Sequence, residues 1–589
     1  MRKQEYINRN SLFGCFFYKK NMVKRIQGIL FFTLLSTIII AQNPKTPDFA
    51  PPVNYKMLLS GTFAELRPNH FHSGIDITTY NKEGIPYYAI ADAYVSRIKV
   101  QAYGYGYALY LTHDGGYVSV YAHLSKYNNK IGSYIRNLQY ENQDFEIDHY
   151  PEKNVLLVKK GDIIGYSGNT GRSSVPHLHF EIRDEKSEHP LNPLHFYEIQ
   201  DNVKPIIKNI RIYPANSNTT VAGQNKAKTY IVKSPTTSPN INYAGIIEVS
   251  GDVFFGIETY DNISGTWNSC GVYSIEVFVD NKSFYKHSMD RFSFDETRYI
   301  NALIDYEEYK KNYARYQWTK VMPGNKLSIY SLHENNGILQ LKDEKVHTIK
   351  YRIKDYAANT SEISFKVQKT ASNNTSTKKK PVQKDFVWNE HNYYLAQGFL
   401  WKMSPGALYE NIGFSYYQKE SSRYLSKLHY VHSVYTPVQK YCEVLIKPDK
   451  EIQFKDRDKL TIVEINKGKV IDCGGVWHKG YIKTEVRSFG VYTVWIDKTA
   501  PVIRPINITN NKNISNQKTI KIKVTDNLTG LAEYNAYLNG EWILMEYDGK
   551  YNLLTYYFDN KLKKGKNEFR LVVADEKKNS SEYKAVLFY

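Results

Sequence analysis

The chain has 589 residues, 42% of them hydrophobic and 14% aromatic, and a formal net charge of +19. This length exceeds what one hydrophobic core organises, so we expect several domains, and the mean hydropathy of −0.52 is typical of a globular protein. A protein with this basic charge could bind nucleic acid, anionic membranes or acidic wall polymers. The sequence shows no helix or β-ribbon on which basic residues are concentrated for base recognition, so no nucleic-acid partner is expected.

The N-terminal segment has the features of an export signal. Two basic residues precede the apolar run 29–40, and Ala41 then offers a small residue for cleavage. We therefore predict a signal peptide region over residues 1–41, with Met22 as an alternative start, and an exported protein in the periplasm, cell envelope or medium. Because the run is shorter than the roughly 20 residues that span a bilayer, no stable membrane span is expected.

Residues 42–200 are rich in strand and turn signals. The runs 108–113 and 117–123 are joined by Asp-Gly-Gly, which predicts a β-hairpin. A polar insertion over 128–155 is expected to pack on the edge of the sheet or to line the rim of a cleft. We predict one domain here, built on an antiparallel β-sheet.

A weak internal repeat marks two later regions. We predict β-sandwich modules of immunoglobulin-like type at 201–370, with a helical insertion, and at 500–589. The repeated segments are 260–265 with 525–530, and 352–362 with 572–582.

The region between these modules divides into two parts. Residues 371–384 are predicted to be a flexible linker, and 385–499 a β-rich domain of unclear type, so the whole chain is expected to be mainly β. Cys442 and Cys473 either pair in an oxidising compartment or remain two buried thiols, and the sequence favours neither reading.

The chemistry of the chain is concentrated in a few histidines. His177 and His179 are two residues apart, so in a strand both imidazoles project from one face, while Leu178 and Phe180 point into the core. One imidazole can then bind a metal while the other stands beside the reacting water. If this His-x-His pair were isolated, we would interpret it as one surface histidine and one core histidine. Here, other residues that can bind a metal occur elsewhere in the same region.

Those further ligands are His72 and Asp76, with His123 as an additional imidazole. Two imidazoles and one carboxylate leave one position of a tetrahedral zinc open for water, whose pKa the metal lowers. His70 is a rival ligand to His72. The same set also suits non-haem iron oxygenases, but the extra histidines and the predicted export favour hydrolysis.

Three motifs, made up of five short segments, resemble in order and spacing the lysostaphin/LytM family of zinc endopeptidases, over about residues 66–196. The resemblance implies a small antiparallel sheet with a cleft across it, and it implies that bacterial peptidoglycan peptides are the substrates. It also implies one Zn²⁺ per chain bound by His72, Asp76 and His179, with His123 and His177 serving catalysis. The matching segments are 69–76, 121–124, 160–162, 167–171 and 176–182.

Three features depart from the family pattern. Val175 stands where a glycine usually precedes Pro-His-x-His, residues 91–93 read Ala-Asp-Ala instead of Ala-Asp-Gly, and the insertion over 128–155 is additional. None of them removes a ligand, so they bear on substrate choice and turnover.

The sequence thus predicts an exported zinc metalloendopeptidase that cleaves peptide cross-links of peptidoglycan. His177 is expected to act as general base and His123 as donor to the oxyanion, with the assignment between the two left open. An inactive scaffold or activator of other wall hydrolases is the alternative. A binding or adhesion protein is the third reading, in which the C-terminal β-domains contact wall polymers or protein partners.

Overall fold

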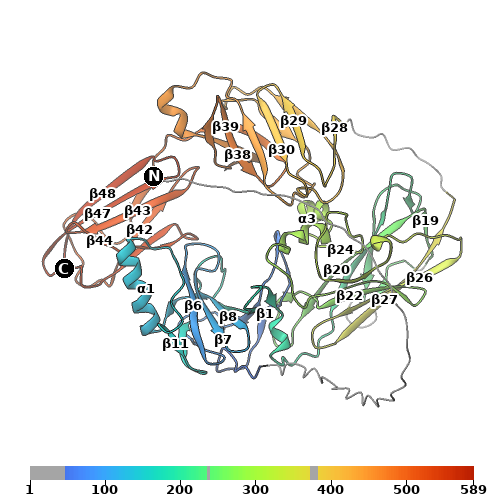
Figure 1. Ribbon diagram of the computed structural model, residues 1–589, viewed down its shortest axis with the longest axis horizontal. Coiled ribbons are helices and arrows are strands. Elements are labelled where there is room, and N and C mark those ends of the chain that lie inside the picture. The colour runs from blue at the N-terminus through green and yellow to red at the C-terminus, as the bar shows by residue number, and fades with distance from the viewer. Residues whose placement is uncertain (1–46, 235–238, 244, 372–381) are drawn as a thin grey trace, which may run out of the picture. The chain divides into compact units, whose positions relative to one another are not determined.

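The computed structural model describes residues 47–234, 239–243, 245–371 and 382–589 (Figure 1). The predicted signal peptide region and most of the predicted linker 371–384 lie outside these residues. Within them the fold is mainly β, as predicted, and no described helix is long and apolar enough to cross a membrane.

The N-terminal region is built on a nine-stranded sheet. Its path is β1-β4-β13-β8-β7-β6-β10, with β11 also paired to β6 and β14 to β13, and every pairing is antiparallel. The strands are β1 Leu59–Gly61, β4 Ile75–Thr78, β6 Ala93–Val100, β7 Tyr107–His113, β8 Tyr117–Leu124, β10 Ile147–His149, β11 Leu157–Val158, β13 His177–Asp184 and β14 Pro190–Leu191.

Shorter elements surround this sheet. A three-stranded sheet has the order β5-β12-β9, and β2 pairs with β3. These elements are β2 Leu66–Arg67, β3 His70–Phe71, β5 Pro86–Tyr88, β9 Lys126–Tyr127, α1 Asn129–Asn142, β12 Ile163–Tyr166 and the 3-10 helix η1 Pro193–His195.

The predicted hairpin and insertion both form. Strands β7 and β8 are the hairpin, joined through the Asp-Gly-Gly turn. The insertion begins with α1, whose N-cap Asn128 accepts a hydrogen bond from the backbone N–H of Ile131. It ends with β10, which pairs with β6 and forms one edge of the sheet. The structure therefore confirms the sheet-edge position for this insertion.

Residues 206–369 form two sheets that enclose one core. One sheet has the order β18-β17-β15-β20-β21, with β24 also on β20, and the other has the order β16-β19-β27-β26-β22-β23-β25. The strands are β15 Ile206–Pro214, β16 Thr220–Val221, β17 Lys228–Lys233, β18 Asn240–Ile241, β19 Ile247–Ser250, β20 Val253–Asn262, β21 Ser269–Cys270, β22 Ser274–Val279, β23 Lys282–Ser288, β24 Gln317–Trp318, β25 Tyr330–His333, β26 Val346–Lys354 and β27 Thr360–Lys369.

The predicted helical insertion lies between β23 and β24. Its buried side chains share a small apolar cluster with Phe63 and Phe71 of the N-terminal region. The insertion contains η2 Thr297–Tyr299, α2 Ile300–Leu303 and α3 Tyr306–Asn312, and η3 Glu334–Gly337 follows β25.

Residues 384–496 form a third β-rich unit. Two five-stranded sheets, β29-β30-β34-β38-β37 and β32-β33-β39-β35-β36, share a core, and β28 pairs with β31. Cys442 and Cys473 are both free thiols, as in the reading without a disulfide. The elements are β28 Lys384–Phe386, β29 Asn392–Ala396, β30 Phe399–Met403, β31 Ile412–Phe414, β32 Tyr416–Lys419, β33 Leu428–Val431, β34 Cys442–Ile446, η4 Phe454–Lys459, β35 Leu460–Asn466, β36 Lys469–Asp472, β37 Val476–His478, β38 Tyr481–Val486 and β39 Gly490–Ile496.

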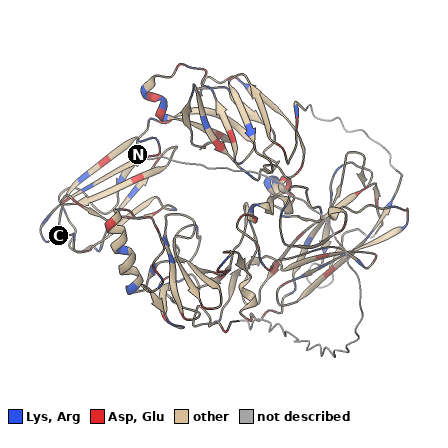
Figure 2. Ribbon diagram, viewed as in Figure 1, with Lys and Arg blue, Asp and Glu red and all other residues tan. Residues whose placement is uncertain are grey.

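Residues 502–588 form two further sheets, of order β40-β42-β46-β45 and β41-β48-β47-β43-β44. Acidic and basic residues are interspersed over the strands of the described chain (Figure 2). The strands are β40 Val502–Pro505, β41 Lys512–Asn513, β42 Thr519–Thr525, β43 Leu531–Leu538, β44 Glu541–Ile543, β45 Glu546–Asp548, β46 Leu553–Tyr557, β47 Lys566–Asp575 and β48 Ser580–Phe588.

Candidate metal centre and active site

The site is built where β4 and β13 pair. Along β13 the side chains alternate, so Leu178, Phe180 and Ile182 are fully buried in the core, as the sequence predicts. His177 and His179 project from the other face. The antiparallel register places His179 directly opposite Asp76 of β4, which makes these two residues a cross-strand pair.

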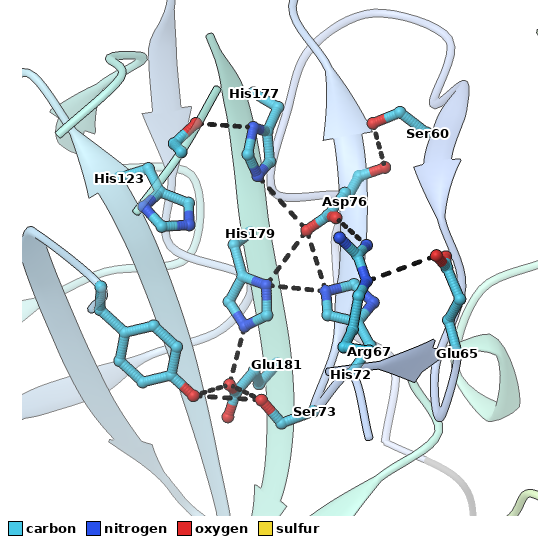
Figure 3. Close-up of polar contacts among 12 residues, drawn as sticks. Ser60, Glu65, Arg67, His72, Ser73, Asp76, His123, His177, His179 and Glu181 are labelled. Atoms are coloured by element: carbon cyan, nitrogen blue, oxygen red, sulfur yellow. Dashed lines mark hydrogen bonds and ion pairs between the residues drawn. The ribbon is translucent and has the colours of Figure 1, made fainter. Parts of the chain in front are cut away.

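Three ligand atoms form a compact triangle at this pair. His72 Nε2 lies 3.0 Å from Asp76 Oδ1 and 2.9 Å from His179 Nδ1, and Asp76 Oδ1 lies 3.1 Å from His179 Nδ1. Ligand atoms of a tetrahedral zinc with bonds of about 2.0–2.2 Å are roughly 3.3–3.5 Å apart, so the triangle is slightly contracted from that geometry. Three of the predicted site residues are therefore brought together as a metal site requires (Figure 3).

The outer contacts fix which nitrogen of each ring faces the triangle. His72 Nδ1 donates to the carbonyl of Thr62 at 2.7 Å, so its Nε2 is left with a free lone pair. His179 Nε2 donates to Glu181 Oε1 at 2.8 Å, so in the neutral ring Nδ1 carries the lone pair. The donor chemistry of the site thus fits a Zn²⁺ ion, which needs neutral imidazoles with their lone pairs directed at it.

Glu181 is a site residue that the sequence reasoning did not assign. It is fully buried and also contacts Arg183 at 2.6 Å, Ser73 Oγ at 2.5 Å and Tyr105 at 2.5 Å. Burial alone would raise the pKa of Glu181, but Arg183 and the hydrogen bonds from His179 and Ser73 hold it well below its usual range. The available signal was its position two residues after His179 on the same strand face.

The carboxylates beside His179 also control its protonation. Burial disfavours the charged ring, but the hydrogen bonds to Asp76 and Glu181 outweigh burial and raise the pKa of His179 to about 9. Without metal the ring therefore carries a proton at neutral pH, and a metal ion must displace that proton to bind.

Replacing Glu181 with glutamine is expected to weaken zinc binding by about 10–100-fold, because the ring of His179 loses a charged acceptor that orients it and raises its basicity. Competition with a chromophoric zinc chelator measures this change. The exposed neighbour Glu185→Gln is the matched control, and equal zinc affinity for the two variants would show that Glu181 has no such role.

His123 and His177 lie beside the triangle. Their ring centroids are 4.9 Å apart, and His177 Nε2 is 3.4 Å from Asp76 Oδ1. His123 Nδ1 donates to the carbonyl of Thr170 at 2.9 Å, and His177 Nδ1 donates to that of Val175 at 2.8 Å. All five predicted site residues therefore converge on one place.

Two details of His123 set it apart. Its backbone has a φ of +63° at the end of β8, a left-handed conformation that is rare for a residue with a side chain. Burial, helped by the nearby His177 and His179 rings, lowers the pKa of His123 to about 3, so the ring is neutral at physiological pH.

Other histidines stay outside the cluster. His70, the rival ligand, is exposed, and its Nδ1 lies 2.8 Å from the carbonyl of Pro68. His113 is buried elsewhere, with Nε2 2.7 Å from Ser119 Oγ. Arg67 was not predicted, yet it donates to Asp76 Oδ2 at 3.0 Å and so holds the carboxylate that completes the triangle.

The last β-module reaches the loop that contacts the imidazoles of His123 and His177. The ammonium group of Lys550 donates to the carbonyl of Asn169, and to that of Ser173 at 3.1 Å. Ser173 Oγ in turn lies 3.2 Å from His177 Nδ1. Val175 has a half-exposed side chain, and its part in the site is its carbonyl.

Comparison with known proteins finds relatives of the region that carries these residues. Residues 70–140 and 152–193 match Peptidase family M23, and the gap falls inside the insertion. The DD-carboxypeptidase/endopeptidase Mpg of Neisseria meningitidis is 32% identical over 123 residues, 21% of this chain and 22% of that protein. Lysostaphin of Staphylococcus simulans is 34% identical over 111 residues, 19% of this chain and 17% of that protein.

Solved structures give the same coverage. The catalytic domain of lysostaphin from Staphylococcus simulans is 28% identical and covers 24% of this chain and 91% of that one, with a TM-score of 0.18. A zinc-containing peptidase from Vibrio cholerae is 25% identical and covers 26% and 40%, with a TM-score of 0.20.

Outside this domain, residues 383–497 match a Zu5-like domain. This match covers almost all of the β-rich region 385–499, whose type the sequence left unclear.

The chain spans about a fifth of the length of the curated relatives that it matches. Within residues 70–193, the chain carries a metallopeptidase domain of family M23, of the lysostaphin/LytM type.

Proposed function

We propose that this protein is an exported, zinc-dependent endopeptidase that cleaves peptide cross-links of bacterial peptidoglycan. The observation that carries the proposal is the triangle of His72, Asp76 and His179 with the imidazoles of His123 and His177 beside it. The three residues would hold one Zn²⁺ per chain, which supplies the Lewis acidity that makes a water nucleophilic near neutral pH. The names of the relatives, lysostaphin among them, support a cell-wall substrate.

His177 is proposed as the general base. Its Nδ1 proton is held by the Val175 carbonyl, so Nε2 presents a lone pair on the side of the ligand triangle. This nitrogen can take the proton of the attacking water, a role that contributes about 10²–10⁴-fold to a rate. The backbone carbonyl then stabilises the charged ring.

His123 is proposed as the second carrier of that proton. Because its Nδ1 donates to the Thr170 carbonyl, the neutral ring presents Nε2 as an acceptor. It therefore donates toward the substrate only after taking a proton itself. This contact favours transfer of the proton to the leaving amine over the oxyanion-donor role expected from the sequence.

Incubation of the purified chain with peptidoglycan sacs tests the proposal. We expect new amine termini on the released fragments, identified by mass spectrometry, when one equivalent of zinc is bound, and none after the metal is removed. Absence of cleavage by chain with stoichiometric zinc, across sacs of different cross-link chemistry, would contradict it.

An inactive scaffold that activates other wall hydrolases remains the competing function. The intact triangle and both imidazoles favour the enzyme over the scaffold. Zinc analysis of the purified protein separates the two, because a scaffold has no need of the metal.

We infer that 201–370 and 500–589 are immunoglobulin-like modules that hold the enzyme at the wall or to protein partners. Their paired sheets and repeated sequence segments support this assignment. Co-sedimentation of sacs with the full chain, compared with a chain ending before residue 500, measures the contribution of the last module. Equal binding by both chains would count against it.

A further inference from the structure

Three carboxylates meet at one end of the first β-sandwich. Asp201 lies just before β15, Asp261 lies in β20, and Asp355 follows β26. One oxygen from each lies within 4.8 Å of the others. Asp261 and Asp355 are 2% and 4% exposed, so most of this charge is removed from water.

The negative charge of this cluster is not neutralised by protein cations. No lysine, arginine or histidine of the described residues forms an ion pair with Asp261 or Asp355. Burial, together with Asp355 and Asp201, raises the pKa of Asp261 to about 8, and burial raises that of Asp355 to about 6. Without a counter-ion such buried carboxylates take up protons, and a bound metal ion is the alternative that lets them stay charged.

Asp261 also has an unsatisfied acceptor. Its Oδ1 is buried and has no hydrogen-bond partner among the described residues. The other two carboxylates are held in place from outside, since Asp201 Oδ1 accepts from Ser264 Oγ at 2.9 Å and Asp355 Oδ2 accepts from Asn359 Nδ2 at 2.8 Å. A buried acceptor without a partner requires an explanation, and a cation held beside the two oriented carboxylates would supply one.

There is space for an ion at this place. A cavity of about 30 Å³ is lined by all three carboxylates and by apolar side chains such as Leu59 and Ile263. A water molecule needs roughly 10–15 Å³ of such volume, so the cavity can admit an ion with a water.

We propose that Asp201, Asp261 and Asp355 bind a Ca²⁺ ion. The donors are carboxylate oxygens, which hard cations prefer, and Ca²⁺ accepts several carboxylates with irregular geometry. Mg²⁺ is less suited, because it keeps most of its water and commonly binds one or two carboxylates. Since Asp201 lies in the segment that joins the peptidase domain to the sandwich, the ion ties that segment to two strands of the module.

The last module repeats the pattern with one difference. Asp497, Asp526 and Asp575 form an equivalent cluster, and Asn579 contacts Asp575 Oδ2 at 2.7 Å as Asn359 contacts Asp355. In the repeated loop, however, the buried Lys577 stands where the first module has Ala357, and it lies close enough to Asp497 for the two charges to interact. The proposal therefore concerns the first cluster alone.

Calorimetric titration of the metal-free full chain with Ca²⁺ tests the site. Relative to the wild type, Asp261→Asn is expected to lose one bound equivalent, or to weaken it at least about 100-fold, while the exposed Asp295→Asn in the same module binds as the wild type does. Mg²⁺ is expected to bind at least about 10-fold more weakly than Ca²⁺. Unchanged Ca²⁺ binding by Asp261→Asn, or preference for Mg²⁺, would overturn the proposal.

Thermal melting separates a lost site from a damaged fold. Ca²⁺ is expected to raise the melting temperature of the wild type by at least about 2 °C and to leave that of Asp261→Asn unchanged. In metal-free buffer Asp261→Asn should melt at or above the wild-type temperature, because asparagine replaces a buried acid that the metal-free fold must keep protonated. A lower melting temperature in metal-free buffer would show a structural carboxylate instead. Repeating the titration in His179→Ala keeps the result independent of the peptidase site.

Discussion

The His179→Ala chain is expected to lose zinc and, with it, at least about 10³-fold of its rate of cross-link cleavage. His179 contributes Nδ1 to the triangle, within 2.9 Å of His72 Nε2 and 3.1 Å of Asp76 Oδ1. The two ligands that remain are one fewer than a catalytic zinc requires, and no other group of the site supplies comparable Lewis acidity.

Two measurements check this expectation. Elemental analysis gives the zinc content of the purified variant, and mass analysis of fragments released from sacs gives its rate. His70→Ala is the matched control, because this histidine lies near the same motif but is exposed and outside the triangle. A His179→Ala chain that keeps both full zinc and full activity would show that the triangle is not the metal site.

Removing either neighbouring imidazole is expected to have a different effect. His177→Ala and His123→Ala should each keep one equivalent of zinc and lose about 10²–10⁴-fold of the cleavage rate, because both act on protons and neither belongs to the triangle. If the two rings carry one proton in succession, the double variant should be little slower than the slower single variant.

The rate at varied pH distinguishes the roles of the two rings. Loss of the base is expected to remove the acid limb of the profile. Loss of His123 is expected to lower the rate without moving either limb, because its ring is already neutral across this pH range. His70→Ala is again the control, because it removes a histidine that lies outside the candidate site. Zinc loss in His177→Ala would instead place this residue among the ligands, and an unchanged rate in His123→Ala would exclude it from proton transfer.

Much of the site was predictable because its signals are local. The two-residue period of a strand puts His177 and His179 on one face and Leu178 in the core, whatever the rest of the chain does. The motif around His72 and Asp76 resembles that of the family, and this resemblance predicted the remaining two ligands. The repeat between the two later modules was equally visible, since it lies in the order of residues.

Residues supplied by distant segments were not predictable in this way. Glu181 acquires its role only because His179 is turned toward it, and Arg67 only because β2 approaches Asp76. Lys550 lies hundreds of positions from the loop whose carbonyls it contacts. Propensity and periodicity describe neighbours in sequence, and these contacts join residues that are neighbours only in space.

The sequence by itself indicated the mainly β fold, because strand alternation depends on local backbone geometry. It indicated the five polar residues of the candidate site and the repeated segments through motif spacing and through resemblance to the family. The tertiary structure alone decided the pairing of β4 with β13 and the tautomers that direct lone pairs at the metal position. It also decided that three aspartates from separate strands and loops meet in one cavity. Register and burial set those distances and charges, and both arise only when the strands have packed.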